Sequence, residues 1–151
     1  MYAIDMDKEI IGFIGSIIIL FMIVIKDIQT NVISNKFVIM LGLLYVSLRI
    51  TVGKDQNIYI LFDGILIAIV MLFINIIFYG AFGGGDIKLM MTSGFLLGFK
   101  GSIKVFIITI ILSSIVGGIQ IIRKKKGLKD GIPLAPMISI GILWEYVNVY
   151  L

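Results

Sequence analysis

One stretch of this chain joins a carboxylate and an ammonium group to three consecutive glycines, at a break between two long apolar runs. It reads Gly83-Gly84-Gly85-Asp86-Ile87-Lys88. A charge in such apolar surroundings is costly unless it has a function or reaches water. Because glycine has no Cβ, the backbone beside the carboxylate can bend sharply and let another chain approach closely. This pattern indicates that Asp86 is one half of a catalytic aspartate pair.

The composition narrows the chemistry that such a pair could support. The chain contains no cysteine and no histidine, which excludes a disulfide framework, a thiol nucleophile, a histidine base and a Cys/His zinc site. We therefore expect no cofactor and no metal ion. Two carboxyl groups close together share one proton and titrate as a unit. The ionised group can draw a proton from water while the protonated group hydrogen-bonds a scissile carbonyl, so the expected reaction is peptide hydrolysis.

The elements that would position this pair are membrane helices. The chain has 151 residues, of which 60% are hydrophobic, and a mean hydropathy of +1.14. A soluble domain is nearer half apolar and could not bury this much. We predict an all-α polytopic membrane protein with one integral membrane domain over residues 1–151.

Six apolar segments are candidates for membrane spans, each of which needs roughly 17–25 residues with its flanks. They lie at 10–25, 37–52, 58–82, 89–99, 105–122 and 132–151. The first is expected to be a span, since the acidic start lacks the basic region and the cleavage site of a signal peptide. The fourth is short; its helix should begin near Asp86, and a turn is expected between Lys100 and Lys104.

The basic residues predict how these spans are oriented. Segments 26–36, 80–88 and 123–131 hold eight of the 13 lysines and arginines, so the positive-inside rule places them in the cytoplasm. Both termini would then lie outside the plasma membrane. The later elements would invert if the short fourth segment did not span. The net charge of +4 is attributed to this topology and not to a nucleic-acid partner, and segment 123–131 is expected to anchor to anionic lipid.

Topology also selects the partner of Asp86. Four acidic residues fall on the opposite side of the membrane: Asp5, Asp7, Glu9 and Asp55. Asp130 falls on the same side of the membrane as Asp86, but it sits among lysines, which is typical of a charge in a solvated loop. Asp27 lies at the cytoplasmic end of the first span. The sequence therefore predicts an Asp27–Asp86 pair at the cytoplasmic boundary.

Three stretches resemble the motifs of type IV prepilin peptidases, a family of intramembrane aspartic proteases. Residues 83–89 look like that family's Gly-x-Gly-Asp-(Val/Ile)-Lys-Leu motif. Residues 27–35 are similar to its first aspartate segment, which ends in Ile-Pro-Asn, although this chain has Ser34 in place of the proline. The stretch Ile132-Pro133-Leu134-Ala135-Pro136 resembles its third signature, the entry into the last helix.

The resemblance implies roles for particular residues and a substrate. Asp27 and Asp86 carry over as the catalytic pair, and the motif residues expected near the substrate are Gly83, Gly84, Gly85, Lys88, Asn35, Pro133 and Pro136. It implies cleavage of a basic leader from prepilin-like precursors, just after a leader glycine. Longer members carry a cytoplasmic insertion, often with cysteines, that is tied to N-methylation. This chain lacks one, so it resembles the peptidase-only forms that serve Tad-type pili or archaeal pilins and flagellins, with no zinc and no methyl donor.

Two other functions remain open on the sequence. Proteases of the presenilin or signal-peptide-peptidase type share the Gly-x-Gly-Asp motif but pair it with a Tyr-Asp in the preceding helix, whereas Asp27 follows Lys26 and two spans intervene. A non-enzymatic transport or accessory subunit would bind ions through its acids, above all Asp63, which could instead pair with a neighbour or reach the outer surface. Lys88 is expected to point away from Asp86 and to snorkel to the headgroups.

Overall fold

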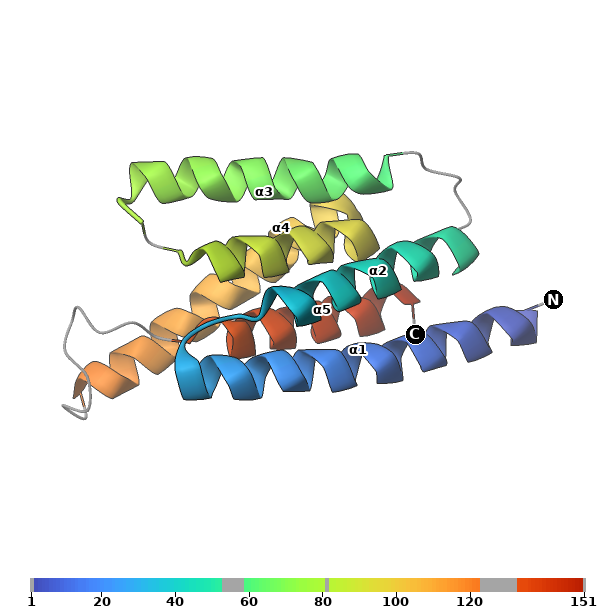
Figure 1. Ribbon diagram of the computed structural model, residues 1–151, viewed down its shortest axis with the longest axis horizontal. Coiled ribbons are helices and arrows are strands. Elements are labelled where there is room, and N and C mark those ends of the chain that lie inside the picture. The colour runs from blue at the N-terminus through green and yellow to red at the C-terminus, as the bar shows by residue number, and fades with distance from the viewer. Residues whose placement is uncertain (1, 53–58, 81, 123–132, 151) are drawn as a thin grey trace.

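The computed structural model describes residues 2–52, 59–80, 82–122 and 133–150. Every element in these residues is an α-helix, which confirms the all-α class. The helices are α1 (Tyr2–Thr30), α2 (Asn35–Val52), α3 (Ile60–Ile77), α4 (Gly84–Ile122) and α5 (Ala135–Tyr150). Figure 1 shows them packed lengthwise, with α3 along one side and α1 along the other.

Helix α4 is divided by a reversal of the chain at Gly98. This residue has φ 70° and ψ 178°, a combination that only glycine adopts without large strain. Figure 1 shows the chain turning back there, so α4 has a first arm (residues 84–97) and a second arm (residues 99–122). The turn expected between Lys100 and Lys104 is wrong, because these residues are helical and the reversal lies before them.

The third apolar run is also shorter as a helix than the sequence predicted. Helix α3 ends at Ile77 rather than continuing to Phe82, because Tyr79 and Gly80 both have positive φ angles. The side-chain oxygen of Asn75 then accepts a hydrogen bond of 2.8 Å from the backbone N–H of Phe82. This contact ties the chain that enters the glycine motif to the end of α3.

The surface of this bundle suits a lipid environment. Large apolar side chains such as Ile18, Phe62 and Phe73 are more than half exposed, which is costly in water and favourable in lipid. By length and composition, residues 7–30 of α1 and the stretch 84–120, which is divided at Gly98, could cross a membrane, while 61–77 of α3 form a shorter apolar helix. The first arm of α4 is only about 21 Å long, whereas the hydrocarbon core of a bilayer is roughly 30 Å thick. The count of six spans stays a prediction.

The bundle gathers the helix ends that carry the three sequence motifs. Helix α1 ends, and α2, α4 and α5 begin, at one end of the molecule (Figure 1), which we call the Asp86 end. Both termini lie at the other end. The chain therefore returns to the Asp86 end after each pair of helical passes, which gathers residues from all three sequence motifs.

Close backbone packing sets the position of the first arm of α4 against α3. A Cβ built on Gly94 would lie 2.5 Å from the Cα of Gly64, so neither glycine could carry a side chain at this crossing. Small residues of this kind let helices approach closely in a membrane, where there is no hydrophobic force between them.

Candidate active site

Asp27 is buried three residues before the end of α1. Only 5% of its surface is exposed, and its Oδ2 accepts a hydrogen bond of 3.1 Å from the backbone N–H of Ala135. Ala135 is the first residue of α5, where backbone N–H groups have no partner within the helix. The carboxylate of Asp27 therefore caps a helix 108 positions away in the sequence, at the end where the helix dipole favours negative charge.

Asp86 is the third residue of α4 and lies half-buried. Its Oδ2 accepts a hydrogen bond of 3.0 Å from the backbone N–H of Gly83, which is the reach-back contact of a capping box. A Cβ built on Gly83 would lie 3.0 Å from the same oxygen. The glycine at position 83 therefore leaves the room that this carboxylate occupies.

Gly85 brings the start of α4 against the segment that follows α1. A Cβ at Gly85 would lie 2.7 Å from the Cβ of Ile33, which is closer than side-chain carbons pack. Ile33 is buried and follows a turn in which the N–H of Asn31 bonds the carbonyl of Asp27 at 2.8 Å. Gly84, in contrast, has open space around its Cα. Of the three motif glycines, Gly83 and Gly85 have a steric role and Gly84 has none.

The two aspartates lie at the same end of the bundle, and each is held by one backbone N–H at a helix start: Asp27 at the start of α5 and Asp86 at the start of its own helix, α4. No hydrogen bond joins the two carboxyl groups within the part of the chain that the structure describes. In each group the N–H contact engages Oδ2, which leaves Oδ1 as the oxygen that could act on water or on a carbonyl.

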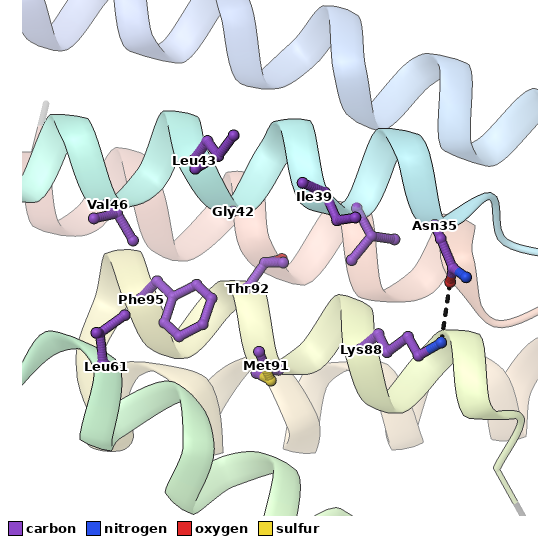
Figure 2. Close-up of a pocket in the computed structure, with 11 residues that line it drawn as sticks. Asn35, Ile39, Gly42, Leu43, Val46, Leu61, Lys88, Met91, Thr92 and Phe95 are labelled. Carbon is purple, nitrogen blue, oxygen red and sulfur yellow. Dashed lines mark hydrogen bonds between the residues drawn. The ribbon is translucent and has the colours of Figure 1, made fainter.

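Lys88 and Asn35 form a polar contact between α4 and α2. The Nζ of Lys88 donates a hydrogen bond of 3.0 Å to the Oδ1 of Asn35, the first residue of α2 (Figure 2). Lys88 lies two residues beyond Asp86, so its side chain leaves the helix on another side, as expected. Sequence reasoning named both residues but missed the bond between them, because they are 53 positions apart.

The two prolines lie where the third motif suggested, at the start of the last helix. Pro133 precedes α5 and Pro136 is its second residue, a place where the missing N–H costs little. Between them stands Ala135, the donor to Asp27. Sequence reasoning missed Ala135 because the donor is a backbone group, and the only signal was that it lies within the Pro-containing motif.

The other acidic residues do not gather at the Asp86 end in the described part of the chain. Asp63 forms a salt bridge of 3.3 Å with Arg49 near the opposite end. The structure therefore supports the expectation that Asp63 pairs with a neighbour. Asp55, Asp130 and the basic segment 123–131 lie outside the described residues, as do the side chain of Asp5 and residue Ile132.

Comparisons with known proteins give one family and one relative. The model of the type IV leader peptidase family matches residues 14–121, a range that includes Asp27 and Asp86. The chain is 30% identical, over 69 residues, to the prepilin leader peptidase/N-methyltransferase of Bacillus subtilis (strain 168). That alignment covers 46% of this chain and 28% of the relative, well short of two thirds of the relative's length. No solved structure matches.

Proposed function

This chain belongs to the type IV leader peptidase family, and from that membership we propose that it is an aspartic endopeptidase that removes the leader from prepilin-like membrane proteins. The observation that carries the proposal is that the family match includes both Asp27 and Asp86. The arrangement of the two residues supports it, since each carboxyl group is fixed by a backbone N–H at the start of a helix.

The proposed mechanism uses one carboxyl group as base and the other as acid. The ionised group takes a proton from a water molecule, which attacks the carbonyl carbon of the scissile peptide bond. The protonated group hydrogen-bonds the carbonyl oxygen and stabilises the tetrahedral intermediate. A proton then passes to the leaving amine as the C–N bond breaks. Each step needs only the two aspartates and water, which suits a chain without histidine or cysteine.

The proposal includes a topology. The Asp86 end would face the cytoplasm, both termini would lie outside the plasma membrane, and the helical arms would make six passes through the bilayer. The substrate would present a short basic leader at the cytoplasmic face, followed by an apolar helix in the membrane. Pro133 and Pro136 would stand beside Asp27. Asn35 and Lys88 would lie at the same end of the bundle, on another face of α4 from Asp86. We further propose that the enzyme cleaves without N-methylation, since the cysteine-containing insertion that the resemblance links to methylation is absent.

The test is cleavage of a co-expressed prepilin, read as a gel shift, by the wild type, Asp27→Asn and Asp86→Asn. Asparagine keeps the size of the side chain and removes the acid, so we expect both variants to be inserted in the membrane but inactive. Asp7→Asn is the matched control, because Asp7 is exposed near the start of α1 and should cleave at the wild-type rate. Near wild-type cleavage by either Asp27→Asn or Asp86→Asn would show that the proposed mechanism is wrong.

A further inference from the structure

A long apolar slot runs along the outside of the bundle between α2 and the first arm of α4, with α3 at one end (Figure 2). Its volume is about 650 Å³. Helix α2 contributes one stripe of its surface, which includes Ile39, Leu43 and Val46, and α4 contributes Met91 and Phe95. Ile39 and Leu43 are both more than 60% exposed, so the slot opens toward the lipid and not into the core.

The length of the slot matches one leaflet of a membrane. It extends along α2 from Asn35 to Val46, which at the rise of an α-helix is about 16 Å. The hydrocarbon core of a bilayer is roughly 30 Å thick, so the slot covers half of it. Near the far end, the ring of Phe95 packs against α3, where a Cβ on Gly64 would lie 2.2 Å from that ring.

The other end of the slot is polar and positively charged. Lys88 and Asn35 stand there, joined by their hydrogen bond (Figure 2). An ammonium group has three N–H donors, and the bond to Asn35 uses one of them. Lys88 is exposed, so its remaining donors can meet an acceptor outside the protein. A cation above an apolar slot of one leaflet's depth complements a lipid with an anionic headgroup.

We propose that this slot binds one acyl chain of an anionic phospholipid from the leaflet at the Asp86 end, with the lipid phosphate at Lys88. The apolar helix of a substrate is a poorer occupant, because a spanning helix needs the full thickness of the bilayer. The slot also lies on the side of α4 from which Lys88 projects, two residues away from Asp86 and on a different helix face. The inference concerns lipid binding and does not depend on the proposed peptidase activity.

The test is native mass spectrometry of the purified full-length protein titrated with phosphatidylglycerol or phosphatidylcholine carrying the same acyl chains. The wild type should retain more phosphatidylglycerol. Lys88→Gln should lower its retention about fivefold, the effect of one basic residue near an anionic lipid. It should lower retention of phosphatidylcholine less, because the choline ammonium offsets the charge of that lipid's phosphate. Lys36→Gln is the matched control, since Lys36 is an exposed lysine in the first turn of α2 that does not line the slot. Equal retention of the two lipids, or equal effects of the two substitutions, would overturn the proposal.

A second pair of variants tests the apolar part of the slot. Gly42 lines it, so Gly42→Leu would fill the space of the acyl chain and should reduce retention of both lipids. Gly118→Leu adds the same side chain to the second arm of α4, where a Cβ meets no atom within 4 Å, and should retain lipid as the wild type does. Unchanged retention in Gly42→Leu would refute lipid as the occupant.

Discussion

Asp27 and Asp86 are held in the same way, although they come from different helices. In each, one carboxyl oxygen accepts a backbone N–H at the start of a helix: from Ala135, the first residue of α5, at 3.1 Å for Asp27, and from Gly83, the residue before α4, at 3.0 Å for Asp86. Hydrogen bonds to a charged group are stronger than neutral ones and fix its orientation. The geometry of these residues therefore depends on neighbours that have no reactive side chain of their own, namely Ala135 and the glycines before Asp86.

The two glycines at positions 84 and 85 provide a residue-scale prediction. Gly85→Ala would place a methyl group 2.7 Å from the Cβ of Ile33, and relieving such an overlap costs about 1–3 kcal/mol. The start of α4 should move away from the segment after α1 and carry Asp86 with it, so prepilin cleavage should fall at least tenfold. Gly84→Ala is the matched control, because a Cβ there meets nothing within 4 Å, and it should cleave normally. Equal cleavage rates for the two variants would contradict this account.

The start of α5 belongs to the site as an element. Its first N–H binds Asp27, and Pro133 and Pro136 stand on either side of that donor. Proline in the first turn of a helix removes only N–H groups that have no partner within the helix. The two prolines therefore mark the start of α5, and the N–H group of Ala135 between them stays available to the carboxylate of Asp27.

Ala135→Pro tests this role of the helix start. Proline is tolerated at the first position of a helix, but it removes the N–H donor and puts a ring carbon where Asp27 accepts its hydrogen bond. Losing a hydrogen bond to a charged group costs roughly 1.5–3 kcal/mol, so the cleavage rate at saturating substrate should fall about tenfold or more.

Ala135→Gly is the control, since it changes the same residue but keeps the N–H. Its cleavage rate should stay within a few fold of the wild type, and circular dichroism should show equal helix content in both variants. Wild-type cleavage by Ala135→Pro would mean that the contact between α5 and Asp27 has no part in the reaction.

Across the whole molecule, the end opposite Asp86 is closed by polar contacts among three helices. Arg49 of α2 pairs with Asp63 of α3 and also donates to the carbonyls of Gly94 and Phe95 near the end of the first arm of α4. A Cβ on Gly98 would lie 3.3 Å from Asp63 and 3.4 Å from Arg49. The pair therefore rests against the reversal of α4 and stabilises the arrangement of the arms rather than the site.

Asp63→Asn separates this structural role from an ion-binding role. The substitution leaves Arg49 without its charged partner, which should lower the stability in detergent by about 1–3 kcal/mol, seen as a lower thermal midpoint. The folded protein should still cleave prepilin. Asp7→Asn is again the control, and it should change neither the thermal midpoint nor the cleavage of prepilin. Loss of function in Asp63→Asn at unchanged stability would instead favour a transport subunit that binds ions at this residue.

The sequence by itself determined the all-α class, the break between helices at the motif glycines and the gathering of Asp27 and Asp86 at one end. These follow from apolar length, from glycine and proline chemistry and from the alternation of helix direction, all of which are local along the chain. The tertiary structure alone decided that the chain reverses at Gly98 and not near Lys100, that Ala135 holds Asp27, and that Lys88 meets Asn35. The reversal depends on a backbone conformation that many glycines could adopt, and the two contacts join residues 108 and 53 positions apart. Periodic patterns in a sequence indicate which residues share a face of one helix, and they cannot reveal contacts between residues so far apart in the chain.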